Sequence, residues 1–276
     1  MSYAFLRFPD FRKKALTLSY DDGMVFDRRL IEILDAYGLK CTFNLNSSTY
    51  GKGRHLTKEE AIQLYKNSGH EVAAHGRKHF SLAEIPTVQA TWEILSDRRD
   101  HEETYDCLVR GLAYANGSYN ERVVNLLKTC DIVYARTVQS TENFSIPTDW
   151  LRWNPTCHHD NPRLLELIDA FLDNTPARNF WREEPRLFYL WGHSYEFSDK
   201  DNWYIIETFA EKVGNRTDVW YATNIEICDY VKAFDSLIFS VDRKRVKNPT
   251  GTDLWLCLYG KEVIVPAGKE VQVETI

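Results

Sequence analysis

The stretch KALTLSYDDG spans residues 14–23 and joins a strand-like pattern to two acidic side chains. Apolar and polar residues alternate up to Tyr20, which is typical of a β-strand, and Gly23 turns the chain directly after Asp21 and Asp22. Adjacent carboxylates repel each other, so the pair is explained most simply if a cation neutralises one of them while the other stays free as a base. The stretch therefore predicts a strand that ends at a metal site.

Further candidate ligands lie in the stretch HGRKH, residues 75–79. His75 and His79 stand four residues apart, which is one helical turn, so both rings are expected on one face. Alone, an Asp-Asp-Gly sequence is more often a solvated turn and a His-x-x-x-His pair more often a solvated helix face. Together with Asp22 the two histidines form a ligand set that suits Zn²⁺ or a similar divalent ion and leaves positions open for water or substrate, which favours catalysis.

Three motifs of the chain resemble those of the polysaccharide deacetylases, the carbohydrate esterases (family four) related to chitooligosaccharide deacetylase. The sequence SYDDG at residues 19–23 is similar to their Thr-Phe-Asp-Asp-Gly motif, and residues 75–79 are similar to their His-x-x-x-His motif. LWGH at residues 190–193 looks like the strand that ends in their late catalytic histidine. The order and spacing of the motifs fit the family over roughly residues 14–235.

The resemblance implies a ligand set and a division of roles. One divalent metal, with Zn²⁺ first and Co²⁺ or Mn²⁺ as alternatives, would be held by Asp22, His75 and His79. Asp21 would accept a proton from the metal-activated water, and His193 would protonate the leaving group as general acid. The alternative for His193 is a core histidine at the end of a barrel strand.

The third motif of the family, Arg-x-Pro-Tyr-Gly, has no intact counterpart. RGLAYANG at residues 110–117 stands nearest to it. With its last glycine as anchor, the resemblance implies that Asn116 offers a backbone N–H to the oxyanion and that Tyr114 lies near the substrate. The arginine that opens this stretch is too far upstream for the family's position. We expect Arg136, at the end of the next strand, to contact Asp21 and keep it ionised, with a solvated Arg136 as the alternative.

A further stretch, TDWLRWNPTCHH at residues 148–159, resembles the Asp-Trp region of the family. The resemblance implies that Asp149 orients His193 and that Trp150 or Trp153 lines the acetyl pocket. The two histidines that end the stretch could supply a further ligand or a substrate contact. A polar loop pair is favoured, because adjacent residues rarely face one site.

Strand and helix patterns alternate through most of the chain. Seven strands are predicted, at residues 14–20, 41–45, 71–74, 108–114, 132–137, 186–191 and 219–222. This alternation predicts the α/β class and, over residues 1–235, an irregular seven-stranded parallel (β/α) barrel with its catalytic groups at the carboxyl ends of the strands. The resemblance implies the same fold.

Residues 236–276 have a different pattern, in which Pro-Thr-Gly and Pro-Ala-Gly turns separate short alternating strands. About 40 residues bury too little surface to fold alone. We therefore expect a C-terminal β extension that packs on the barrel. A structural flap or a dimer element is favoured over a carbohydrate-binding role.

Composition argues against several classes of protein. The chain of 276 residues carries a formal net charge of -6 and has no basic stripe, which argues against nucleic-acid binding. No apolar run reaches membrane-spanning length, and the N-terminus lacks the core of a signal peptide, so a cytoplasmic protein without membrane contact is expected. The 6 cysteines form no Cys-x-x-Cys pair, which favours reduced thiols over a disulfide framework.

These observations predict a metal-dependent hydrolase that removes N-acetyl or O-acetyl groups from acetylated oligosaccharides. Two alternatives stay open. One is a related hydrolase of a non-sugar amide, such as an allantoin-like or imide compound, which a closed small pocket would favour over an open groove. The other is a carbohydrate-binding protein that has lost turnover, which the incomplete third motif suggests. The sequence also leaves a homo-oligomer open.

Overall fold

The computed structural model describes residues 4–175 and 184–273. Its main sheet is parallel and follows the order β6-β5-β4-β3-β2-β8-β7, with β9 as a further strand on β2. The α/β class and the seven parallel strands are confirmed. The strands are β2 (Lys14–Asp21), β3 (Cys41–Leu45), β4 (Glu71–Ala74), β5 (Gly111–Ala113), β6 (Tyr134–Arg136), β7 (Cys157–His158), β8 (Arg186–Gly192) and β9 (Val219–Tyr221).

The seventh place in this sheet belongs to β7 and not to the predicted strand at residues 219–222. That segment is β9, which pairs with the first half of β2, so that Lys14 lies opposite Val219. The sequence pattern does not predict β7, because a strand of 2 residues after Pro155 carries too few alternating positions to be recognised.

The segment that leads into β7 joins the two ends of the curled sheet. Trp153 forms a parallel bridge with Arg136 of β6, and Cys157 pairs with Leu190 of β8. The strands therefore surround a common interior, as the predicted barrel requires.

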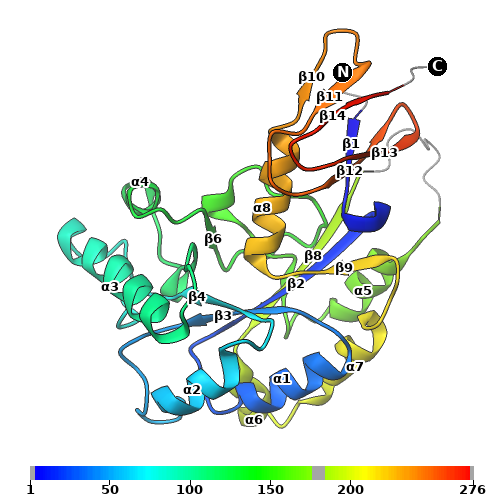
Figure 1. The fold of residues 1–276 in the computed structure, drawn as a ribbon. Helices are drawn as coiled ribbons and strands as arrows, with labels where there is room; N and C mark the ends of the chain where they lie inside the picture. Colours follow the sequence, from blue (N-terminus) through cyan, green and yellow to red (C-terminus); the bar gives the residue numbers. More distant parts are fainter. Residues whose placement is uncertain (1–3, 176–183, 274–276) are drawn as a thin grey trace.

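Alternate residues of β2 face opposite sides of the sheet. Leu16, Leu18 and Tyr20 are buried in a core that also contains the helix residue Leu30. Asp21 therefore points to the other side, into the barrel. The helices lie outside the sheet (Figure 1) and are α1 (Asp27–Ala36), α2 (Lys58–Tyr65), α3 (Thr87–Tyr105), α4 (Glu121–Thr129), α5 (Leu164–Leu172), α6 (Ser194–Asp199), α7 (Tyr204–Val213) and α8 (Asn224–Asp235). Short 3-10 helices are η1 (Pro9–Phe11), η2 (Ala115–Gly117) and η3 (Trp150–Arg152).

The C-terminal strands form two small antiparallel sheets at one end of the molecule, beside α8 (Figure 1). Their apolar side chains, Leu254 and Leu256 among them, share a buried cluster with Tyr230 of α8 and Leu6. The sequence assigns residues 1–235 to the barrel, yet β1 belongs to one of these sheets, because it pairs with β12. The strands are β1 (Ala4–Arg7), β10 (Ile238–Phe239), β11 (Arg245–Lys247), β12 (Leu254–Leu258), β13 (Lys261–Val265) and β14 (Glu270–Gln272).

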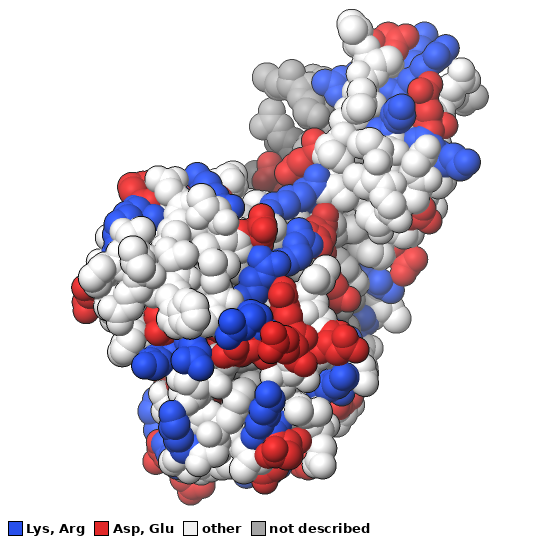
Figure 2. Space-filling model, turned by 60° about the vertical axis from the view of Figure 1, so that its left-hand side comes forward, with Lys and Arg blue, Asp and Glu red and all other residues white. Residues whose placement is uncertain are grey.

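The surface shown in Figure 2 carries basic and acidic side chains interspersed with one another. Among the helices of the described residues, none combines the length and the apolar character that crossing a bilayer requires.

Candidate metal and active site

The predicted catalytic residues come together at the carboxyl ends of three strands. Asp21 ends β2, His75 follows β4 and His193 follows β8. Parallel strands place their carboxyl ends at the same edge of a sheet, so residues far apart in the sequence meet there. Asp21 Oδ2 lies 3.7 Å from His75 Nε2 and 3.8 Å from His193 Nε2.

The three candidate metal ligands surround one point. Asp22 Oδ1 lies 3.8 Å from His75 Nε2 and 3.7 Å from His79 Nε2, and the candidate ligand atoms of all three residues lie within 4.8 Å of one another. The expected helical turn is wrong, however. The chain forms a tight turn at Gly76, and Asp22 and His79 adopt positive φ angles of 79° and 60°, which only a few per cent of non-glycine residues adopt.

The imidazole of His75 is oriented for a metal. Its Nδ1 lies 2.8 Å from the carbonyl oxygen of Ala113, so Nδ1 carries the proton and Nε2 keeps a free lone pair toward Asp22. A backbone carbonyl behind a ligating histidine is the usual second contact of metal sites. Two imidazole nitrogens and one carboxylate oxygen suit Zn²⁺ or a similar divalent ion, so the residues present fit the metal that the resemblance implies.

The carboxylate of Asp21 is buried between charged groups. Arg136 donates a hydrogen bond to Asp21 Oδ2, and Asn44 Nδ2 donates to Oδ1 at 2.8 Å. Burial by itself raises the pKa of Asp21, but its neighbours, above all the positive charge of Arg136, outweigh burial and lower that pKa below its ordinary value. Arg110 lies elsewhere, since it pairs with the exposed Asp229 at 2.8 Å. Arg136 is therefore the arginine that contacts the candidate base.

A carboxylate that the sequence motifs did not predict, Glu196, forms a hydrogen bond with His193. Glu196 Oε1 lies 2.9 Å from His193 Nδ1, across the first turn of α6. Burial lowers the pKa of His193, but the hydrogen bond to Glu196 and the charges of Asp21 and Asp22 outweigh burial and raise it. His193 is therefore suited to hold a proton at Nε2. The spacing of three residues at a helix start could have indicated this partner.

The prediction that Asp149 orients His193 is wrong. Asp149 Oδ1 accepts a hydrogen bond from the backbone N–H of Leu151 at 3.0 Å, and its other oxygen pairs with Arg152. Asp149 and Trp150 line a cavity together with Val133, which precedes β6. Both residues thus lie toward the amino ends of the strands, on the side opposite His193.

The other predicted substrate contacts are engaged within the protein. Tyr114 is 1% exposed and donates its hydroxyl to the carbonyl oxygen of Leu151 at 2.8 Å. Trp153, also 1% exposed, has its ring centroid 4.6 Å from that of Tyr189. These contacts contradict the predicted substrate roles of Tyr114 and Trp153. Asn116 is exposed and its side chain donates to Ser81, so its predicted backbone role stays a prediction.

The aromatic side chain of Trp191, for which the sequence predicted no role, lies beside His193. Trp191 has its ring centroid 5.8 Å from that of His193, and the Arg136 guanidinium stacks over the Trp191 ring at 4.3 Å. Residues two apart on a strand share a face, so the position of Trp191 could have been read from LWGH.

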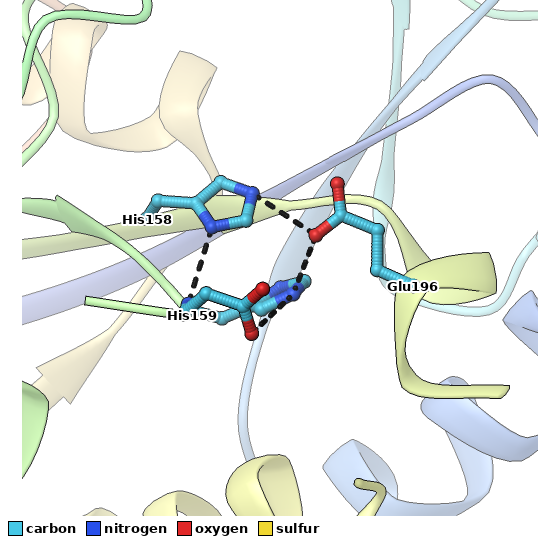
Figure 3. A group of neighbouring side chains, drawn as sticks. His158, His159 and Glu196 are labelled. Carbon is cyan, nitrogen blue, oxygen red and sulfur yellow. Dashed lines mark hydrogen bonds and ion pairs between the residues drawn. The ribbon is translucent and has the colours of Figure 1, made fainter. Parts of the chain in front are cut away.

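The adjacent histidines at the end of β7, His158 and the following His159, both turn toward Glu196 (Figure 3). His158 Nε2 lies 3.4 Å and His159 Nε2 3.0 Å from Glu196 Oε2. The expected loop pair with divergent side chains is wrong, because β7 ends at His158 and the chain turns at once. The backbone N–H of Asp160 donates to His158 Nδ1 at 3.1 Å, so the proton of neutral His158 is on Nε2 and its donor is directed to Glu196. This arrangement supports the carboxylate and leaves His158 without a lone pair for a metal.

Comparison with known proteins agrees with this geometry. Residues 9–135 match the family model described as polysaccharide deacetylase. A solved structure from Mycobacterium smegmatis, named provisionally as a polysaccharide deacetylase, shares 18% identity over 85% of this chain and 96% of its own, with a TM-score of 0.62. No curated protein gives a significant match.

Two other solved structures share the fold at lower similarity. BA3943 of Bacillus anthracis, described as a CE4 family pseudoenzyme, has 18% identity over 82% of this chain and 68% of its own, with a TM-score of 0.51. The peptidoglycan deacetylase PdaC of Bacillus subtilis, solved as a mutant, has 14% identity over 81% of this chain and 94% of its own, with a TM-score of 0.52. The family model covers both the strand that ends at Asp21 and the His75–His79 turn, so this part of the chain matches the polysaccharide deacetylase family, and the whole chain has the fold of these structures.

Proposed function

We propose that the protein is a metal-dependent hydrolase that removes N-acetyl or O-acetyl groups from acetylated sugars. The observation that carries this proposal is the position of Asp21. Its carboxylate is held by Arg136 and lies 3.7 Å from His75 Nε2 and 3.8 Å from His193 Nε2, between the candidate metal ligands and the candidate acid.

The residues of the site have complementary roles in this reaction. A divalent metal held by Asp22, His75 and His79 would polarise the acetyl carbonyl and lower the pKa of a water molecule. Asp21, kept ionised by its neighbours, accepts the proton that the attacking water loses. His193 donates its Nε2 proton to the leaving amine or alcohol of the sugar, and acetate is the other product.

The carbohydrate-binding alternative has some support from a relative, because BA3943 is described as a pseudoenzyme. In this chain, however, Arg136 contacts Asp21 although the third motif is incomplete. The side chains of His79 and His193 are 33% and 19% exposed, so solutes can reach both. The site therefore has candidate metal ligands, a candidate base and a candidate acid, and solvent reaches it. This favours an active hydrolase over a carbohydrate-binding protein without turnover.

The proposal is tested by acetate release in the presence of Zn²⁺, Co²⁺ or Mn²⁺. The substrate panel contains chitooligosaccharides, acetylated xylo-oligosaccharides and peptidoglycan fragments, and a second panel contains allantoin-like and imide compounds. Acetate release from the sugars supports the proposal. Turnover of the second panel alone, or calorimetric binding of the sugars without release, would replace it with one of the two alternatives.

The arginine contact makes a prediction for the pH profile. Arg136 lowers the pKa of Asp21, and the base must be ionised to act. Arg136→Ala is therefore expected to raise that pKa and move the acid-side limb of the kcat/KM profile to higher pH. Arg110→Ala is the matched control, since Arg110 pairs with Asp229 on the surface and the limb should stay in place. The assignment of Arg136 is wrong if the limb moves in the Arg110 variant instead.

The contact between Glu196 and His193 predicts a shift at the other end of the profile. Glu196 raises the pKa of His193, and the acid must be protonated to act. Glu196→Gln is expected to lower that pKa, move the alkaline limb to lower pH and reduce kcat by about 10-fold or more. Asp149→Asn serves as the control and should leave the limb unchanged. A shift in the Asp149 variant and none in the Glu196 variant would restore the original assignment.

A further inference from the structure

The loop that carries both candidate histidine ligands rests on an acidic face of α3. We call residues 75–79 the ligand loop. Glu93, Asp97 and Asp100 follow one another at spacings of four and three residues, so their side chains share one face of the helix. Glu93 and Asp97 are 2% and 0% exposed. Buried carboxylates need hydrogen-bond donors, and here several of the donors come from the ligand loop.

Backbone N–H groups of the ligand loop point at these carboxylates. The N–H of Lys78 donates to Glu93 Oε2 at 2.7 Å, and the N–H of His75 donates to Asp97 Oδ2 at 3.0 Å. The N–H of Arg77 donates to the carbonyl oxygen of Glu93 at 3.3 Å. Three of the five residues in the loop are thus attached to α3 through their backbone N–H groups. These hydrogen bonds do not depend on a metal at the histidine side chains.

The opposite side of the ligand loop is held by the turn after β3. Asn46 Nδ2 donates to the carbonyl oxygen of Gly76 at 2.6 Å. The same turn is itself attached to α3, since the N–H of Ser47 donates to Asp97 Oδ1 at 2.7 Å and the Ser47 hydroxyl to Asp100 Oδ2 at 3.1 Å. Asp97 therefore binds both the turn after β3 and the ligand loop, so both segments are attached to α3.

We propose that this acidic face positions the ligand loop for the metal, so that Glu93 and Asp97 set metal affinity without touching the metal. The inference rests on the metal site of the proposed function. The loop contains a positive φ angle at His79, and such a backbone at a non-glycine residue persists only where its surroundings hold it. A loop fixed in advance loses less conformational freedom when its histidines bind.

The experiment compares two substitutions at one position. Glu93→Ala removes the acceptor of the Lys78 N–H, whereas Glu93→Gln keeps a carbonyl oxygen that can accept it. In a competition titration of the metal-free protein with Zn²⁺, the Ala variant is expected to bind about 10- to 100-fold more weakly, as loss of a supporting contact commonly does. The Gln variant should recover most of the affinity. Glu103→Gln, on the same helix with a 70% exposed side chain, is the matched control and should bind as the wild type does.

A second measurement reports on the loop without metal. Hydrogen exchange of the His75 and Lys78 amides should be about 10-fold faster in metal-free Glu93→Ala, because local opening becomes easier. Asp97→Asn should show the same two changes, because asparagine keeps one acceptor oxygen for the two N–H groups, of Ser47 and His75, that Asp97 binds. If these variants fail to fold, Asp100→Asn at a partly exposed residue should show both changes to a smaller degree, because Asp100 accepts from the Arg77 side chain and the Ser47 hydroxyl. If the wild type binds Zn²⁺ tightly but the variants have unchanged Zn²⁺ affinity and unchanged amide exchange rates, this inference is wrong and the proposed metal site still stands. A wild-type protein that binds no Zn²⁺ would overturn the metal site as well.

Discussion

Asp21→Asn is expected to lower kcat by about 10²-fold or more while the protein keeps its metal. Asparagine has the size of aspartate but cannot accept the proton of the attacking water. It also leaves the buried Arg136 without its anionic partner, which costs about 3–5 kcal/mol when a buried pair is broken. Acetate release and elemental analysis are therefore measured on the same folded sample, with thermal unfolding recorded to separate lost stability from lost chemistry.

The neighbouring aspartate provides the contrast for this experiment. Asp22→Asn should lose metal affinity, because its carboxylate belongs to the ligand set, and should lose turnover as a consequence. Equal metal content in the two variants would mean that the division of roles between the adjacent carboxylates is wrong.

His79→Ala is expected to abolish both bound metal and turnover. A site with three protein ligands has little affinity left when one is removed. His79 has a 33% exposed side chain, so its loss should disturb the fold less than loss of the buried His75. His55→Ala is the control, since His55 is partly exposed and lies outside the candidate ligand set. Full metal occupancy in His79→Ala, measured by elemental analysis, would remove His79 from the ligands.

The residues of the candidate site that could be predicted are those that local sequence determines. Asp21, Asp22 and His193 follow strands whose alternation is visible, and a strand end fixes where the next side chain lies. His75 and His79 were expected to meet through a helical turn, but they meet through a tight turn at Gly76. The spacing was informative although the conformation inferred from it was wrong.

Contacts that depend on a long irregular segment could not be predicted. Asp149 was assigned by its position in a motif, yet the chain between β6 and β7 runs toward the amino ends of the strands before it returns. No local sequence pattern predicts this path of the chain. Glu196 then takes the place beside His193 from a different element, because α6 begins directly after β8. The carboxylate beside His193 is therefore Glu196, whereas the motif indicated Asp149.

The pairing of β1 with β12 has a consequence for how the protein folds during synthesis. Ala4 lies opposite Leu258, so β1 has no partner until almost the whole sequence up to that residue has left the ribosome. At about 5–20 residues per second, synthesis of the intervening residues takes roughly 13–50 s, and β1 stays unpaired for that time. During that time the nascent chain exposes an apolar strand with free edges, which can pair with other chains. Closing so large a loop is also slow, and we expect this sheet to be among the last parts of the protein to form.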